Sequence, residues 1–216
     1  MSKDYFNAAA AGWDTPERVA RAVEMAEAIG RALPLLPEAV LADYGSGTGL
    51  VAALLAPQVA RVVALDNAPN MLARLAEKCR ASGIPNIETR VFDIETETFE
   101  APFCEVFLSS LVLHHLPSPE RFARAAWQAL RPGGTVAVID LDCEGGDFHT
   151  GQDEVHHHGF EREALAAIFS AAGFTELSCE TVLTIRKRGR SGVERDFCLF
   201  MLKGRNTVTA LSLEIG

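Results

Sequence analysis

Residues 40–50, VLADYGSGTGL, constrain the fold of this chain more than any other stretch. An apolar run reaches Asp43, and glycines then occupy every second position, at Gly45, Gly47 and Gly49. Glycine adopts positive φ angles without a steric penalty, and it lets a ligand approach the backbone closely. The pattern predicts a strand that turns tightly into a helix, with a nucleoside-bearing ligand bound on the turn.

Strand-like and helix-like segments alternate along most of the chain. Periodic apolar residues and capping signals predict helices over 15–33, 50–56, 69–83, 118–134 and 161–174. Short apolar runs predict strands over 39–45, 61–66, 87–93, 103–110, 135–141, 175–188 and 196–204. Since no helix separates the last two runs, these strands must pair antiparallel. The sequence therefore predicts an α/β fold, a parallel sheet with helices on both faces that ends in an antiparallel strand pair.

The first 35 residues are expected to form a helical extension of a single domain. We predict one domain over 1–216, with the extension over 1–35 and the core over 36–205. Helical spacing predicts a buried stripe on the helix over 15–33, made of Val19, Val23, Ala26, Ile29 and Leu33.

The segment before that helix is amphipathic and contains Tyr5, Phe6 and Trp13. Ordinary packing of a terminal segment against the core would account for these aromatic side chains. We favour the alternative that the segment is a lid, which closes over the ligand and excludes water from it.

The balance of charges restricts the class of partner. Asp and Glu number 29 against 20 Lys and Arg, a formal net charge of -9, which argues against a nucleic-acid substrate. No run approaches the ~20 apolar residues of a membrane span, so no membrane insertion is expected. Five cysteines without a CxxC pair indicate reduced thiols in a cytoplasmic protein. We expect a monomer or homodimer that acts on a small molecule.

Three of the predicted strands end in an acid on the edge where ligands of such sheets bind. Asp43 precedes the glycine turn, Asp66 ends the second strand and Asp93 ends the third. A carboxylate offers two acceptor oxygens, so Asp66 is suited to the two vicinal hydroxyls of a ribose. Asp93 lies where it would accept a hydrogen bond from the exocyclic amine of a base.

Two kinds of nucleoside ligand are compatible with a glycine turn. A dinucleotide site has the spacing G-x-G-x-x-G, whereas here the third glycine, Gly49, comes one residue early and Leu50 stands in its place. This departure disfavours an NAD(P)-dependent oxidoreductase, which stays as an alternative. A non-catalytic protein that binds the cofactor is a second alternative.

Several stretches together resemble class I S-adenosylmethionine-dependent methyltransferases. They are VLADYGSGTG, VVALDNAPNMLARLAEK, VFDIE and FLSSLVLHHLPSPERFARAAWQALRPGGTVAVIDL. The last is similar to the methyltransferase type 11 group, akin to the ubiquinone and menaquinone methyltransferases. The resemblance implies a seven-stranded Rossmann-like sheet. It also implies methyl transfer from S-adenosylmethionine to an O, N or C nucleophile of a small-molecule acceptor, with S-adenosylhomocysteine as product.

The resemblance also implies a set of cofactor-binding residues. The glycine turn would hold the methionine part, Asp66 the ribose hydroxyls, and Asn67, Met71, Asp93 and Ile94 the adenine. The serines after the fourth strand would lie beside the sulfonium. The full implied set is Asp43, Gly45, Ser46, Gly47, Gly49, Asp66, Asn67, Met71, Asp93, Ile94, Ser109 and Ser110.

Histidines follow the fourth strand and recur in the long loop over 142–160. His114, His115 and His157 are candidate catalytic residues, as a general base or as groups that orient the acceptor. Purely structural roles remain open for all three. His156, His157 and His158, with Asp140, Asp142, Cys143 and His149 nearby, raise the alternative of a metal site. Adjacent side chains of an extended segment point apart, so of the three consecutive histidines only His156 and His158 could face one ion. We expect no metal, because in-line displacement at a sulfonium mainly needs alignment of the reactants.

Overall fold

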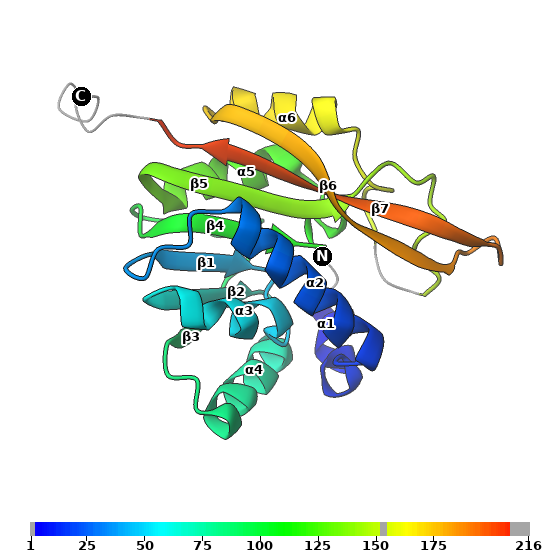
Figure 1. Ribbon diagram of the computed structural model, residues 1–216, viewed down its shortest axis with the longest axis horizontal. Coiled ribbons are helices and arrows are strands. Elements are labelled where there is room, and N and C mark those ends of the chain that lie inside the picture. Colours follow the sequence, from blue (N-terminus) through cyan, green and yellow to red (C-terminus); the bar gives the residue numbers. More distant parts are fainter. Residues whose placement is uncertain (1–2, 152–154, 208–216) are drawn as a thin grey trace.

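The computed structural model describes residues 3–151 and 155–207, and these build one seven-stranded sheet flanked by helices (Figure 1). The strand order is β3-β2-β1-β4-β5-β7-β6. The strands are β1 Val40–Tyr44, β2 Arg61–Asp66, β3 Ile87–Val91, β4 Cys104–Ser110, β5 Leu130–Leu141, β6 Thr175–Arg188 and β7 Glu194–Arg205. The predicted domain end at 216 lies outside the described residues.

The pairing directions confirm the predicted fold. Strands β1, β2, β3, β4 and β5 pair parallel, whereas β7 pairs antiparallel with both β5 and β6. All five residues of β1 are buried, as expected for a parallel strand covered on both faces. The chain reverses its winding between β1 and β4, and this switch point is where open parallel sheets bind ligands.

Helices cover the two faces of the sheet in separate groups. The α-helices are α1 Lys3–Ala9, α2 Pro16–Ala32, α3 Leu50–Leu55, α4 Pro69–Ser82, α5 Pro119–Ala129 and α6 Arg162–Ala171. Short 3-10 turns are η1 Ala10–Gly12, η2 Ala56–Gln58 and η3 Leu113–His115. One apolar core lies under α5 and α6 around Phe122 and Phe169, and another lies under α2 and α3 around Ile29 and Leu55.

Local signals explain where these helices begin and end. Thr15 and Ser118 cap α2 and α5, because each hydroxyl accepts a hydrogen bond from a backbone N–H of the first turn. Helix α4 ends at Gly83, which has a φ of 64°. The helix predicted over 118–134 ends earlier, at Ala129, since Leu130 already pairs with β4. Among the described residues, no helix is long and apolar enough to cross a membrane.

The predicted stripe of α2 is partly wrong. Val19 and Val23 are 41 % and 39 % exposed, whereas Ala22 and Met25 of the neighbouring stripe are buried. The alternative stripe contains several alanines, whose small side chains let α2 approach α3 closely. The sequence offers two overlapping apolar stripes, and close packing selects the one with the smaller residues.

Candidate functional site

A cavity of about 140 Å³ lies at the carboxyl ends of β1, β2 and β4. It is closed on one side by the glycine turn after β1 and on the other by the N-terminal segment. Its lining includes eight of the candidate cofactor-binding and catalytic residues of the sequence, namely Asp43, Gly45, Ser46, Gly47, Asp66, Met71, Ser110 and His115. The cavity therefore lies at the switch point of the sheet, as the glycine turn predicts.

The three glycines of the turn all have positive φ angles, of 71°, 56° and 74° along the chain. A Cβ atom at Gly45 would lie 2.3 Å from Val112, and one at Gly49 would lie 2.2 Å from Leu75. At Gly47 the nearest atom would be Nε1 of Trp13, at 3.9 Å. Gly45 and Gly49 are thus needed for packing, whereas Gly47 leaves space on the side of the ligand.

Two buried carboxyls form the floor of the cavity. Burial and, to a smaller extent, the nearby charge of Asp66 together raise the pKa of Asp43 to about 7. Burial also raises the pKa of Asp66, to about 6. The Asp66 carboxylate accepts hydrogen bonds of 2.8 Å from the backbone N–H groups of Gly47 and Ala68. Each oxygen keeps a further lone pair, so Asp66 both shapes the turn and can accept from a ligand.

The remaining implied cofactor residues lie around the cavity and are not part of its lining. Ser109 is fully buried and donates to the backbone oxygen of Tyr44, and the N–H of Ile94 donates to the Tyr44 hydroxyl. Asp93 accepts a hydrogen bond from the N–H of Glu95. Asn67 is buried beside Asp66, and its Oδ1 has no hydrogen-bond partner among the described residues.

The N-terminal segment covers the cavity. Phe6 and Trp13 line it, and their rings pack edge to face at a centroid distance of 5.5 Å. Asp14 accepts hydrogen bonds from the Thr48 hydroxyl and, at 2.8 Å, from Lys78 Nζ. These contacts tie the segment to the glycine turn and to α4, the arrangement that a closed lid requires.

A second cavity of about 280 Å³ adjoins the first. Phe6, Trp13, Arg18, Arg21, Leu111 and His115 line both cavities. The second cavity is otherwise lined by Tyr5, His114, Phe148, His149, Thr150, Gly151 and Lys187. Sequence reasoning did not single out Arg18 and Arg21, whose only sequence signal is their position one turn apart at the start of α2.

The histidines after β4 and in the long loop have different environments. His114 and His115 form η3, and His114 Nδ1 lies 2.7 Å from Asp140 Oδ1 at the end of β5. His157 does not line either cavity. Its ring packs against Phe160, and its backbone N–H donates to the His114 carbonyl. The loop histidine that faces the second cavity is instead His149.

Comparison with known proteins agrees with this geometry. Residues 42–138 match the family model described as a methyltransferase domain. An uncharacterized methyltransferase of Schizosaccharomyces pombe is 26 % identical over 148 residues, 62 % of this chain and 52 % of that protein. A trans-aconitate 2-methyltransferase of Deinococcus radiodurans is 37 % identical over 109 residues, 49 % of this chain and 39 % of that protein. The chain thus spans about half the length, or less, of these curated relatives.

Solved structures have the same fold. A methyltransferase of Aquifex aeolicus that depends on S-adenosylmethionine superposes with a TM-score of 0.68 at 18 % identity, over 93 % of this chain and 98 % of that one. The DhpI–SAH complex superposes with a TM-score of 0.71 at 22 % identity, over 96 % of both chains. The matched family and the sheet order confirm that the sequence resembles methyltransferases. They disfavour the alternative of a dinucleotide-dependent oxidoreductase. The chain therefore carries a match to a methyltransferase domain over residues 42–138, and its seven-stranded sheet has the class I methyltransferase fold.

Proposed function

We propose that the first cavity binds S-adenosylmethionine and that the second binds a small-molecule acceptor of its methyl group. The observation that carries this proposal is the shared wall of the two cavities, formed by Phe6, Leu111 and His115 among others. Methyl transfer needs donor and acceptor to meet in line within contact distance. Two adjoining cavities at the switch point of the sheet meet that requirement.

The first cavity has the groups that such a cofactor needs. Ser46 Oγ is buried there and has no hydrogen-bond partner among the described residues, so a polar ligand would satisfy it. Asp43 and the backbone around Gly47 would hold the charged methionine part. Asp66 would accept from the ribose hydroxyls, and Met71 would pack against the adenine. We propose supporting roles from outside the cavity for Gly49, Asn67, Asp93, Ile94 and Ser109.

For methyl transfer, the protein mainly has to align the two reactants and exclude water from them. When bound, S-adenosylmethionine supplies an activated methyl group for in-line displacement. A nucleophile of the acceptor would form a bond to the methyl carbon as the carbon–sulfur bond breaks, leaving S-adenosylhomocysteine; a carboxylate needs to lose no proton, whereas a protonated nucleophile would release its proton to water or to a nearby base. The N-terminal segment excludes water from this step. The positions of His115 and Ser110 at the cavity walls are suited to orienting the acceptor against the methyl group.

The charge of the second cavity favours an anionic acceptor. Arg18, Arg21 and Lys187 line it, and no acidic side chain of the described residues does so. Burial lowers the pKa of Arg21, and the nearby charge of Arg18 lowers it further. A carboxylate or phosphate group on the acceptor would offset this cost.

Ligand binding tests the proposal directly. S-adenosylhomocysteine should raise the melting temperature of the protein, whereas NAD and NADP should leave it unchanged. Asp66→Ala should weaken binding of S-adenosylhomocysteine by roughly 1–3 kcal/mol, because two charge-assisted hydrogen bonds are lost. The control is Glu88→Ala, since Glu88 pairs with Arg61 on the exposed surface of β3, three register positions away from the residue that pairs with Asp66. Equal binding by Asp66→Ala and the control would remove Asp66 from the site.

Turnover separates an enzyme from a non-catalytic binder. A screen of small carboxylates and phenols with labelled S-adenosylmethionine should yield a labelled product for at least one class of acceptor. A protein that binds S-adenosylhomocysteine but labels none of them would support the non-catalytic alternative.

A further inference from the structure

Three histidines converge at the inner end of the second cavity. One ring nitrogen from each of His114, His115 and His149 can be chosen so that all three lie within 4.8 Å of one another. The ring centroids of His114 and His115 are 4.1 Å apart, and those of His114 and His149 are 4.9 Å apart. We propose that this cluster is a binding site for a divalent transition metal ion such as Zn²⁺, placed to hold the acceptor.

The environment of the His114 ring is that of an imidazole that binds a metal ion. His114 is 1 % exposed, and its Nδ1 lies 2.7 Å from Asp140 Oδ1. Asp140 is itself buried and also accepts from the backbone N–H groups of His114 and Leu141, so its carboxylate is held in place. The other ring nitrogen, Nε2, is buried without a hydrogen-bond partner among the described residues. When one ring nitrogen of a histidine binds a metal, the other commonly donates a hydrogen bond to a carboxylate, which orients the ring.

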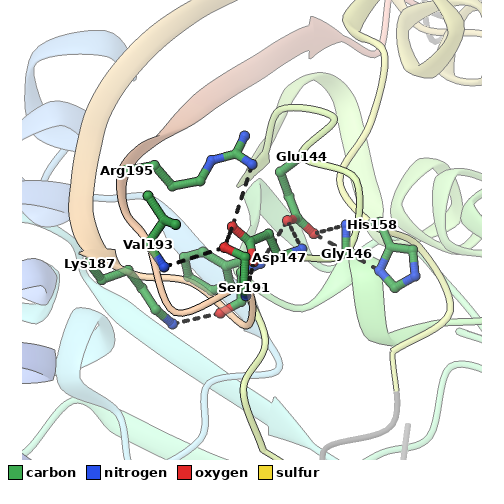
Figure 2. A network of polar contacts seen from close by, with 9 residues as sticks. Glu144, Gly146, Asp147, His158, Lys187, Ser191, Val193 and Arg195 are labelled. Atoms are coloured by element: carbon green, nitrogen blue, oxygen red, sulfur yellow. Dashed lines mark hydrogen bonds and ion pairs between the residues drawn. The ribbon is translucent and has the colours of Figure 1, made fainter.

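A network of polar contacts around Glu144 and Asp147 holds the segment that precedes His149 (Figure 2). The buried Glu144 carboxylate accepts hydrogen bonds from the backbone N–H groups of Gly146, Asp147 and Phe148. Asp147 in turn accepts hydrogen bonds from the backbone and the hydroxyl of Ser191, at the turn between β6 and β7. The carboxylates of Glu144 and Asp147 thus hold in place the segment that precedes His149.

Phe148, directly before His149, is fixed as well. Its carbonyl accepts a 2.7 Å hydrogen bond from Lys187 Nζ, which also lies 4.1 Å from the centre of its ring. The ring packs edge to face against Phe197 of β7. A rigid supporting segment is what a preformed metal ligand requires.

Three imidazoles and one open position are a common arrangement for a metal that binds a substrate. Zn²⁺ binds imidazole nitrogens at about 2.0–2.1 Å, so small rotations of the rings would bring the three nitrogens into coordination. His115 lines both cavities, so an ion bound by the cluster would lie near the wall that the second cavity shares with the first. An anionic acceptor would bridge the ion and the guanidinium groups of Arg18 and Arg21. The sequence led us to expect no metal, because in-line displacement mainly needs alignment. It also gave no sign that His114 and His115 lie beside His149, which is 34 positions beyond His115.

This assignment deepens the proposed function and rests on it for the role of the ion, but the binding of the ion is tested separately. Metal-free protein should bind one equivalent of Zn²⁺ in equilibrium dialysis, and Co²⁺ should give the visible absorption of a tetrahedral site. His149→Ala should weaken binding at least 10-fold, and Asp140→Asn should weaken it about 10- to 100-fold through His114.

His158→Ala is the matched control. His158 belongs to the same loop, its side chain is 59 % exposed, and it does not belong to the cluster. This variant should bind Zn²⁺ like the unaltered protein. Binding of S-adenosylhomocysteine, measured on every variant, reports on the fold and on the donor cavity. Zn²⁺ binding that is absent, or equally strong in His149→Ala and His158→Ala, would overturn the metal site whatever the donor cavity binds.

Discussion

Burial in the folded protein disfavours the ionised form of the Asp43 carboxyl. Its pKa lies near 7 in the folded protein, raised by burial from an ordinary value of 3.8. A raised folded-state pKa stabilises the folded protein fully below the unfolded pKa, and this contribution is lost as the pH rises through about 7. The free energy of unfolding of the ligand-free protein should therefore fall between about pH 4 and 7.

Asp43→Asn should flatten this dependence, because the amide stays neutral. The variant should be more stable than the unaltered protein at pH 8, by an amount on the order of a few kcal/mol, in urea denaturation series at several pH values. It should also bind S-adenosylhomocysteine weakly, since we propose the ionised carboxylate as the partner of the ligand's ammonium group. Parallel stability curves for the two proteins would contradict the assignment of the pH dependence to Asp43.

The role of Gly47 can be tested separately from those of Gly45 and Gly49 by substituting it with alanine. Gly47→Ala places a methyl group in a left-handed backbone with open space around it, at a cost of about 1–2 kcal/mol. Gly83→Ala is the matched control, because Gly83 has a similar φ of 64° with nothing within 4 Å, at the end of α4. Both variants should lose similar stability in thermal unfolding, but only Gly47→Ala should lose affinity for S-adenosylhomocysteine in calorimetry. Equal affinities would mean that the turn does not approach the ligand.

At the scale of elements, the N-terminal segment makes the clearest prediction. It packs on α4 and on the glycine turn through Asn7 and Asp14, and it contributes Phe6 and Trp13 to the cavity. Among the described residues of this segment, 3–14, only Ala10 belongs to the buried apolar core. Deletion up to Asp14 should therefore reduce methyl transfer at least 10-fold and lower the melting temperature only slightly. An equal loss of both would mean that the segment is part of the core and not a lid.

The elements also show how far sequence patterns reach. The strand and helix segments, the antiparallel pair and the cap at Ser118 follow from local signals, and the structure confirms them. The buried face of α2 does not, because Val19 and Ala22 lie on overlapping stripes and only packing against α3 decides between them. Likewise, the sequence places Asp43 and Asp66 on one edge of the sheet, but it cannot show that Asp66 already bonds to the glycine turn.

At the scale of the whole molecule, the second cavity is assembled from distant parts of the chain. Tyr5, Arg21, His115, His149 and Lys187 come from the N-terminal segment, α2, η3, the long loop and β6. No local pattern joins these residues, so this cavity could not be predicted as a unit from the sequence. Charge is distributed unevenly in this assembly. The chain carries a formal net charge of -9, yet the charged side chains of the described residues that line this cavity, Arg18, Arg21 and Lys187, are all basic.

That uneven distribution of charge predicts how anions bind. A small dicarboxylate such as succinate should bind metal-free protein in calorimetry, and added salt should weaken binding only modestly, because partly buried charges are screened less than exposed ones. Arg21→Gln should reduce the affinity at least 10-fold, since a charge-assisted hydrogen bond is worth about 1.5–3 kcal/mol. Arg186→Gln is the control, because Arg186 pairs with Asp196 on the exposed face of the hairpin. If both variants bound succinate equally well, the acceptor would be recognised by shape and apolar contact, and the anionic class would be wrong.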